Sequence, residues 1–331
     1  MIEEKKQQTE EIAEHLKQQF NISVYDAVPI DKGWLNVKWR METERGPIFV
    51  KFYHPSRYKL HLRPERKAAI HRTLKLQHRL SLSGVKCPRV YHRHEQYLHE
   101  TPDGLHYAVL DWVDGNPLAA GEANEEQMFD LGRQTGKMHR WLQSVKLLDE
   151  PDWKPDPAAY AKQWQVNWDK AKDEQDEIVM EWLLRSRQLV DGLDFRMFDS
   201  CDAGWLHWDL WVDNILVEER GVAGIVDFDR MSMAYPELDL ARAALSETLR
   251  DGQLNIDAIE AFMEGYREHV QMPKGCLPRA LCMLYLMEST WWLRTEVRKE
   301  SELRSLLQRF IEEMHWIEDH WEELPELLAH V

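Results

Sequence analysis

The sequence has little of what would place it in several large protein classes. It contains four cysteines among 331 residues and no Cys-x-x-Cys pair, so neither a structural zinc site nor a disulfide framework is indicated. No run of about 18 apolar residues occurs, so we expect no membrane-spanning helix. The charged first residues lack an apolar segment, so we expect no signal peptide. These absences predict a reducing, cytoplasmic setting.

Basic residues are also in deficit. Lys and Arg number 42 against 58 Asp and Glu, which gives a net charge of −16 at pH 7. This balance argues against a nucleic-acid partner, whose phosphates require clustered Lys and Arg. Hydrophobic residues make up 44% of the chain, enough for a sizeable core, and the length suggests two domains or one large two-lobed unit. The 15 tryptophans suit either ordinary packing or an aromatic pocket for a cation or a flat ligand.

The first part of the chain predicts a small β-rich region. Ile12, Leu16 and Phe20 recur at helical spacing, and the following residues alternate in the two-residue period of strands. Three of the strands form an antiparallel meander. The expected elements are helices at 3–20 and 62–82 and strands at 22–30, 37–41, 48–53, 87–91 and 107–113.

The remainder predicts a mainly helical region. Residues 125–145 and 158–190 have helical patterns, a short β-like block covers 205–229, and helices follow from Pro236 to Leu328. The fold class is therefore α+β, with a small antiparallel domain followed by a larger helical one.

The block of residues 207–217, His-Trp-Asp-Leu-Trp-Val-Asp-Asn-Ile-Leu-Val, carries the most specific chemistry. The strand pattern after Asn214 is followed by a turn and a second strand pattern that ends at Asp227. A hairpin here would bring Asn214 and Asp227 together, with Asp209 on the preceding loop. Asn214 and Asp227 carry hard oxygen ligands of the kind that Mg²⁺ takes beside nucleotide phosphates. Asp209 is then left to orient, or take the proton of, a substrate hydroxyl.

The spacing of His207, Asp209 and Asn214 matches the catalytic-loop pattern of protein kinases. The residues after Asp227 are Phe-Asp, where protein kinases have Phe-Gly. With these motifs the sequence resembles the aminoglycoside phosphotransferase/choline kinase-like family, which includes spore-coat kinase-like proteins, and the resemblance covers most of the chain.

The resemblance implies a bilobal protein-kinase-like fold with a nucleotide-binding lobe at 1–112 and a helical catalytic lobe at 113–331. It implies ATP and Mg²⁺ as cofactors and transfer of the γ-phosphate to a hydroxyl of a small molecule such as an amino alcohol, an aminoglycoside or a sugar. Asp209 would be catalytic, and Asn214 and Asp227 would hold the metal. The nucleotide-binding residues implied are Gly33, Asn36, Lys51, Glu65 as the partner of Lys51, and Asp111 and Val113 in the hinge.

Several residues keep alternative interpretations. We expect His207 to brace the loop, Asp239 to be a helix or loop anchor and His139 to be a packed helix residue. Asp229 contacts metal or substrate, or else orients Arg230. Trp208 stands where the family has a small residue. Candidates for the acceptor site are Trp164, Trp168, Trp208, Trp211, Trp291 and Trp292.

The nature of the acceptor also stays open. An acidic chain rich in aromatics favours an ammonium-bearing alcohol, and a neutral sugar is the alternative. Two other functions compete with the kinase: a catalytically silent kinase-like binding or spore-coat protein, and a metal-dependent hydrolase using His207, Asp209 and Asp227.

Overall fold

The structure is a computed structural model that describes residues 2–30, 37–300 and 304–331. The chain divides into two compact units. The first contains residues 1–116 and 223–230, and the second contains 117–222 and 231–331. Among the described residues, no helix combines the length and apolarity that a membrane crossing needs. The expected α+β class is confirmed, with an antiparallel sheet near the N-terminus and a helical C-terminal part.

The first unit is built on a five-stranded antiparallel sheet in the order β1-β2-β3-β5-β4. The predicted meander of three strands is confirmed by the pairing of β1 with β2 and of β2 with β3. The elements of this unit are α1 (Ile2–Phe20), β1 (Val24–Ile30), β2 (Val37–Thr43), β3 (Gly46–Tyr53), α2 (Pro55–Tyr58), α3 (Pro64–Leu82), β4 (His99–Glu100), β5 (His106–Asp111) and η3 (Phe228–Arg230).

One strand prediction in this unit is wrong. Residues 87–91 form no continuous strand, and Val90 makes only an isolated bridge to Leu110. Residues 89–91 still lie beside β5, since the N–H of Tyr91 donates to the oxygen of Val109 and the N–H of Asp111 donates to that of Arg89, while β4 pairs with the other end of β5. Pro88, which has no N–H to donate, interrupts the segment.

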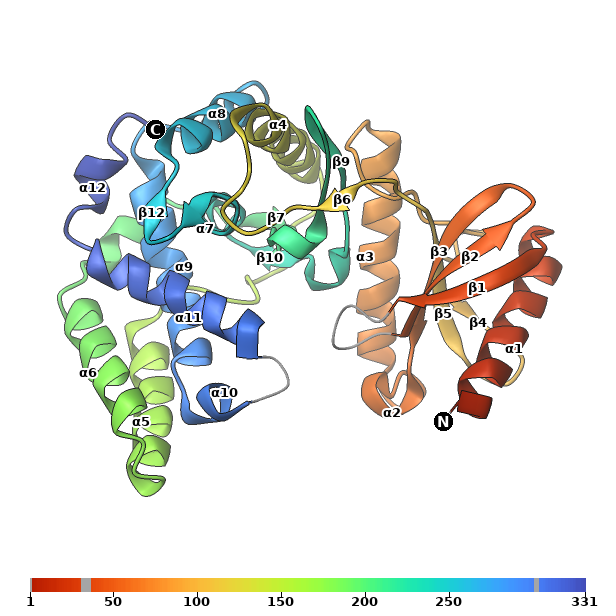
Figure 1. Ribbon diagram of the computed structural model, residues 1–331, viewed down its shortest axis with the longest axis horizontal. Coiled ribbons are helices and arrows are strands. Elements are labelled where there is room, and N and C mark those ends of the chain that lie inside the picture. Colours follow the sequence, from red (N-terminus) through yellow and green to blue (C-terminus); the bar gives the residue numbers. More distant parts are fainter. Residues whose placement is uncertain (1, 31–36, 301–303) are drawn as a thin grey trace. The chain divides into compact units, whose positions relative to one another are not determined.

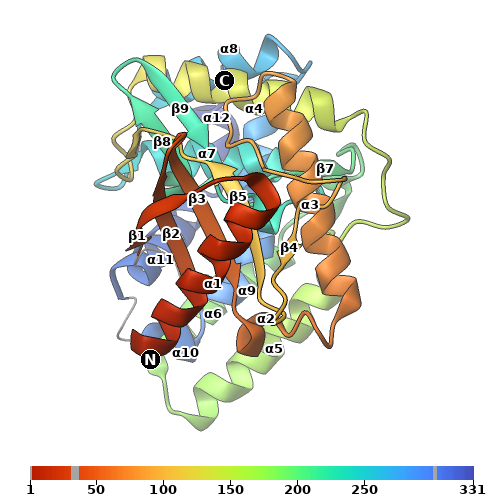
Figure 2. The same cartoon turned by 90° about the vertical axis from the view of Figure 1, so that its right-hand side faces the viewer.

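Helices cover both faces of this sheet (Figures 1 and 2). Ile12 and Leu16 of α1 pack on one face in a core that includes Trp39 and Val50. Leu74 of α3 packs on the other face. The alternation of strand side chains therefore buries two apolar layers, which fixes the register of the strands that carry the site.

The second unit is mainly helical. A small sheet has the strand order β6-β8-β9, and the boundaries between the two units fall within β6 and within β9. Its elements are β6 (Asn116–Pro117), α4 (Glu125–Leu142), α5 (Pro157–Asp173), α6 (Glu177–Asp191), η1 (Phe195–Phe198), β7 (Gly204–Leu206), η2 (Val212–Asn214), β8 (Ile215–Glu218), β9 (Gly221–Ile225), β10 (Ser232–Ala234), α7 (Glu237–Thr248), β11 (Leu249–Arg250), β12 (Gln253–Leu254), α8 (Ile256–Arg267), α9 (Cys276–Trp292), α10 (Thr295–Lys299), α11 (Arg304–Asp319) and α12 (Leu324–Leu327).

Glycines bring α4 and α8 into close contact (Figure 1). A Cβ atom added to Gly132 would lie 1.9 Å from the backbone oxygen of Phe262, and one added to Gly265 would lie 2.1 Å from that of Phe129. Only glycine permits this approach of the two backbones. The pair forms a rigid frame for His139, which is carried on the last turns of α4.

The helical prediction for 158–190 is correct in type, although the segment is two helices, α5 and α6, separated at residues 174–176. Asp176 caps α6 by accepting a hydrogen bond from the N–H of Val179. An Asx residue followed by a fresh helical start is the local signal of that break.

Candidate active site

The loop between β7 and β8 carries the most specific motif. The side-chain nitrogen of Asn214 donates to the backbone oxygen of Asp209 at 2.9 Å and to its carboxylate Oδ2 at 3.1 Å. The N–H of Asn214 closes the 3-10 turn onto the oxygen of Trp211 at 2.7 Å. Asp209 and Asn214, which are five positions apart in the sequence, are therefore in contact because the 3-10 turn brings them together. Asp209 is partly exposed and Asn214 is buried.

Asp239 anchors this loop from α7. One carboxylate oxygen accepts the backbone N–H of His207 at 2.7 Å, and the other accepts that of Trp208 at 2.8 Å. His139 lies 3.0 Å from the same carboxylate and 3.0 Å from the hydroxyl of Tyr266. The expected anchoring role of Asp239 therefore has a geometric basis. His139 is buried, as expected, and links the loop anchor to α8.

Trp208 has an unusual backbone conformation. Its φ is +70°, in the left-handed region that bulky side chains avoid at a cost of about 1–3 kcal/mol. The hydrogen bond from its N–H to Asp239 helps to hold this conformation. A glycine would adopt it freely, so the tryptophan here stores strain directly before Asp209.

The first unit carries a second charged cluster. The ammonium group of Lys51 on β3 lies 2.7 Å from a carboxylate oxygen of Asp227 and 2.6 Å from one of Asp229. Lys38 on β2 lies 3.2 Å from the other oxygen of Asp227. Asp227 also has a positive φ of +59°, which turns the chain before η3. Two lysines and two carboxylates thus compensate one another at the sheet.

This pairing controls the protonation of the cluster. Burial alone would lower the pKa of Lys51, but the carboxylates of Asp227 and Asp229 raise it above its ordinary value. Burial opposes ionisation of Asp227, yet Lys51 and Lys38 hold the pKa of its carboxyl well below the usual range. Both partners are therefore charged at neutral pH.

The expected pair of Lys51 with Glu65 is not formed. Glu65 lies exposed in the first turn of α3 and makes no ion pair with a described residue. The physical reason is that Asp227 and Asp229 already neutralise the buried ammonium group. Asp229, for which the sequence left two roles open, is an ion-pair partner of Lys51.

The sequence analysis did not predict Lys38 as a site residue, although the strand pattern contains a signal for it. The register of β2 and β3 places Lys38 directly opposite Lys51. Two like charges at a cross-strand position repel unless an anion lies between them. Aligning the strands predicted at 37–41 and 48–53 as an antiparallel pair would have revealed that these two lysines lie opposite each other.

The expected hinge and nucleotide loop are only partly described. The N–H of Asp111 donates to the oxygen of Arg89 at 2.9 Å, and its carboxylate pairs with the Arg89 guanidinium at 3.3 Å. The N–H of Val113 makes no hydrogen bond to a described residue. Gly33 and Asn36 lie outside the described residues.

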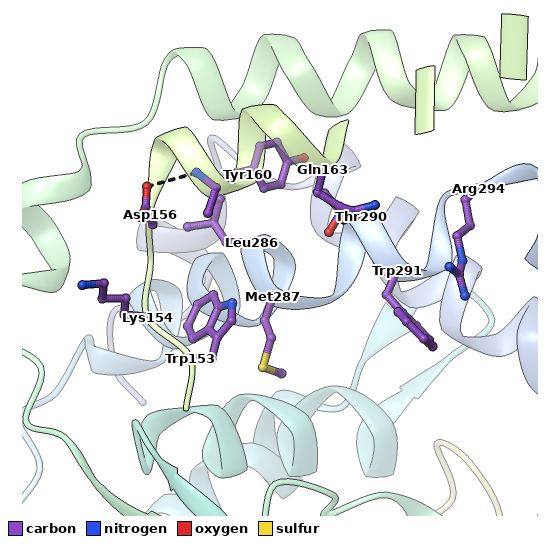
Figure 3. A pocket seen from close by; sticks show the side chains of 11 residues that line it. Trp153, Lys154, Asp156, Tyr160, Gln163, Leu286, Met287, Thr290, Trp291 and Arg294 are labelled. Carbon is purple, nitrogen blue, oxygen red and sulfur yellow. Dashed lines mark hydrogen bonds between the residues drawn. The ribbon is translucent and has the colours of Figure 1, made fainter. Parts of the chain in front are cut away.

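Most of the tryptophans expected at an acceptor site pack elsewhere. Trp164 and Trp168 stack on each other at 5.3 Å, beside the small core between α5 and α6. Trp211 and Trp292 lie against Phe310, at 4.3 and 4.2 Å between ring centroids. Trp291 lines a cavity in the second unit whose lining includes none of the other five (Figure 3). Helical spacing could not separate packed from pocket-lining rings.

Comparisons with known proteins identify a family for this chain. The model of a family described as "Phosphotransferase enzyme family" matches residues 26–273. Among curated proteins, a homoserine kinase of Agrobacterium fabrum (strain C58) is 24% identical over 241 residues, which is 72% of this chain and 69% of that protein.

Two solved structures share the fold. An amicoumacin kinase in complex with AMP-PNP and Ca²⁺ aligns with a TM-score of 0.60 and 15% identity over 92% of each chain. A spectinomycin phosphotransferase in complex with ADP and spectinomycin aligns with a TM-score of 0.57 and 16% identity over 97% of each chain. At these identities the likeness concerns the fold.

Proposed function

Because the chain belongs to the phosphotransferase enzyme family, we propose that it transfers the γ-phosphoryl group of ATP to a hydroxyl group of a small molecule, with Mg²⁺ bound. The observation that carries this proposal is the contact of Asn214 with Asp209 on a loop whose backbone Asp239 fixes. A carboxylate held in place by an amide donor suits phosphoryl transfer, because the chemistry depends mainly on positioning and charge neutralisation.

Asp209 is the proposed catalytic residue. In the reaction, the acceptor oxygen bonds to the γ-phosphorus while the bond from that phosphorus to the β–γ bridging oxygen breaks, and ADP leaves. The carboxylate of Asp209 orients the attacking hydroxyl and accepts its proton. Its partial exposure is consistent with access by an acceptor.

The donor chemistry of Asn214 in the second unit, and that of Asp227 in the first, suits a magnesium ion. The side-chain nitrogen of Asn214 is committed to Asp209, which leaves its oxygen as a ligand. Asp227 supplies a carboxylate that Lys51 and Lys38 now balance. No cluster of three or more His, Cys, Asp or Glu suited to a metal occurs in the described ranges, and Mg²⁺ with a nucleotide needs only one or two carboxylates because phosphates and waters complete its shell. When bound, the ion neutralises phosphate charge.

Lys51 and Lys38 are the proposed phosphate contacts. The two lysines lie opposite each other on the paired strands β2 and β3. The ammonium group of each binds a carboxylate oxygen. Phosphate oxygens present the same chemistry to them. We propose that the hinge binds the adenine base through the N–H of Val113, since the N–H of Asp111 already donates to the oxygen of Arg89. Gly33, Asn36 and Glu65 remain predictions from the resemblance.

The acceptor is the least determined part of the proposal. The curated relatives are named for homoserine, and the solved structures are named for amicoumacin and spectinomycin. These names support a hydroxyl acceptor of small-molecule size, without choosing among the compounds.

The test compares Asp209→Asn with Asp213→Asn. Asp213 is an exposed carboxylate on the same loop, so it controls for the loss of one charge there. Transfer from labelled ATP is measured over a panel of amino acids, aminoglycosides and sugars. We expect D209N to lose at least about 10³-fold in transfer rate, within the range of general-base effects, and D213N to stay within about threefold. Undiminished transfer by D209N would refute the assignment.

A further inference from the structure

A cavity of about 350 Å³ opens beside α5 and α9 in the second unit (Figure 3). This volume is at the lower end of the range of small-molecule sites. The residues that line it come from the segment before α5, from α5 itself, from α9, and from Arg294 two residues after α9. They include Trp153, Lys154, Asp156, Tyr160, Trp291 and Arg294.

The cavity is connected to the loop of Asp209 within the same unit. The N–H of Asp152, next to the wall residue Trp153, donates to the oxygen of Met233 on β10 at 2.8 Å. Strand β10 pairs with β7, where Met233 lies opposite Trp205. Strand β7 ends at Leu206 and leads directly into the loop. One wall of the cavity is therefore tied to the strand pair that positions Asp209.

Three aromatic side chains provide flat apolar surface. Tyr160 is buried, and its hydroxyl is 3.3 Å from that of Ser289, so its polar end is already engaged. Trp153 packs edge-on against Tyr235, with ring centroids 6.4 Å apart. Trp291 is more than half exposed. Such walls suit the apolar face of a ring or a carbon chain.

Hydrogen-bond donors in the cavity lack partners. Lys154 and Arg294 form no ion pair with any residue the structure describes, and the indole nitrogens of Trp153 and Trp291 donate to none of them. The Nε of Arg294 is buried without an acceptor. Its guanidinium group lies 4.1 Å from the centre of the Trp291 ring, which holds it at the cavity wall. A buried donor without an acceptor is costly, and a bound acceptor group would remove that cost.

The lining offers few groups to satisfy these donors. Asp156 is the one carboxylate among the lining residues, and its Oδ1 accepts the N–H groups of Ala158 and Ala159 at the start of α5. Lys154, Arg294 and Asp156 give the lining residues a formal charge of +1. Lys154 is exposed, and Arg294 also interacts with the carboxylate of Glu296, which lies outside the lining. This local charge opposes the net charge of the chain, and it disfavours the ammonium-bearing acceptor that the acidic composition suggested.

We propose that the acceptor is a hydroxylated carboxylate whose carboxylate group binds Arg294 and whose body packs on Trp153, Tyr160 and Trp291. A guanidinium group binds a carboxylate through two parallel hydrogen bonds, and no other common ligand group fits its fork as well except phosphate. The hydroxyl requirement rests on the proposed function. The carboxylate requirement rests on the cavity alone.

The test uses ligands that differ in one group. The first set is D-gluconate, D-glucitol and D-glucamine, and the second is D-glucuronate, D-glucose and D-glucosamine. L-Homoserine with L-homoserinamide forms a third, smaller set. Binding to the full-length protein is measured by calorimetry or ligand-observed NMR without nucleotide, and Mg·ATP binding is measured separately, so that a failure of this proposal is distinguished from a failure of the phosphotransferase assignment.

We expect the carboxylate member of at least one set to bind at least tenfold more tightly than its neutral and cationic partners. Arg294→Gln should abolish that preference and Arg294→Lys should retain part of it, with Mg·ATP binding unchanged in both. Arg187→Gln is the matched control, because Arg187 also lies over a tryptophan ring, that of Trp164, but outside the cavity. The proposal is overturned if no carboxylate member binds, if a cationic or neutral member binds as well in every set, or if R294Q keeps the preference.

Discussion

The charged cluster of the first unit and the loop anchor Asp239 of the second hold their charges in opposite ways. In the first, every charge of the cluster has a counter-charge: Lys51 and Lys38 face Asp227 and Asp229. In the second, Asp239 is satisfied by backbone N–H groups and a histidine. Ion pairs exchange partners readily with an incoming phosphate or cation, whereas backbone hydrogen bonds fix a geometry. Under the proposed function, the cluster of the first unit exchanges ligands and the anchored loop of the second holds the reacting group still.

A second contrast concerns compensation. Both carboxylate oxygens of Glu247 on α7 are buried without a partner among the described residues. Burial, reinforced by Glu313, raises the pKa of Glu247 well above its ordinary value despite Arg309 and Arg242. Arg242 instead pairs with Glu288 and Glu313. Burial thus favours the protonated form of Glu247 in the second unit, while the two lysines favour the ionised form of Asp227 in the first.

The largest expected effect tests the rigidity of the second unit. Gly132→Ala should lower the free energy of unfolding by more than about 3 kcal/mol, because its Cβ would meet the Phe262 backbone at 1.9 Å. Urea unfolding measures this change. Gly192→Ala is the control, since its nearest neighbour would be 3.6 Å away, and we expect it to change stability by less than about 1 kcal/mol. Equal stability of the two variants would remove close packing as the basis of this rigidity.

The next prediction separates the units by pH. Burial lowers the pKa of His99 to about 4 and also lowers those of His15, His78 and His106 in the same unit. A histidine with a folded pKa below its unfolded value gives stability that is present above pH 6.5 and lost as the pH falls toward 4. His99 alone accounts for about 2 kcal/mol lost between pH 7.5 and pH 5.

Glu247 has the opposite sign. Its raised pKa gives stability that is present below pH 4.5 and lost as the pH rises through the folded value. We therefore expect acid to unfold the first unit before the second. Hydrogen exchange at pH 5 measures the loss of protection in each unit. His99→Gln should reduce the acid sensitivity. Simultaneous loss of protection in both units would contradict the contrast.

A third prediction concerns the charge pairing of the first unit. Lys51→Met should cost about 1–2 kcal/mol, because the carboxylates of Asp227 and Asp229 then lose the ammonium group that both of them bind, while Asp227 keeps its pair with Lys38. The loss is below that of a fully buried pair, since these carboxylates are partly exposed. Lys67→Met is the control: its pair with Glu100 is exposed, so we expect less than about 1 kcal/mol. Thermal unfolding of both variants gives the comparison, and equal losses would refute it.

The smallest expected effect concerns the anchor of the catalytic loop. Asp239→Asn should lower kcat about tenfold with little change in the KM for ATP, because an amide has one oxygen for two N–H donors. Asp130→Asn is matched to it, since Asp130 is also buried and accepts a backbone N–H, that of Val222. We expect D130N to lose stability and to keep kcat. Parallel losses of kcat in both variants would make the role of Asp239 merely structural.

Local patterns in the sequence predicted more of the fold than of the site. Helical and strand periods located α1, β1 to β3, α3 and α4, since each buries an apolar face. The β11–β12 hairpin was missed, although Asp251-Gly252 is a strong two-residue turn signal and both residues have positive φ. A helical pattern on either side concealed it.

At the site, short-range spacing was informative and long-range pairing was not. The motif placed Asp209 and Asn214 together because one turn joins them. The partner of Lys51 depends on where residues 227–229 reach the sheet, and no local period encodes that. The lining of the cavity likewise joins residues more than 100 positions apart, so Trp153 and Arg294 carried no signal in the sequence.

The proposed function assigns nucleotide binding to the charged cluster and phosphoryl transfer to the anchored loop. Calorimetric titration of Mg·ATP into the wild-type protein, Asp227→Asn and Asp209→Asn tests it most directly. We predict micromolar binding by the wild type, binding weakened at least tenfold by D227N, and binding nearly unchanged by D209N. Absence of Mg·ATP binding by the wild-type protein would contradict the account and favour a kinase-like fold without turnover.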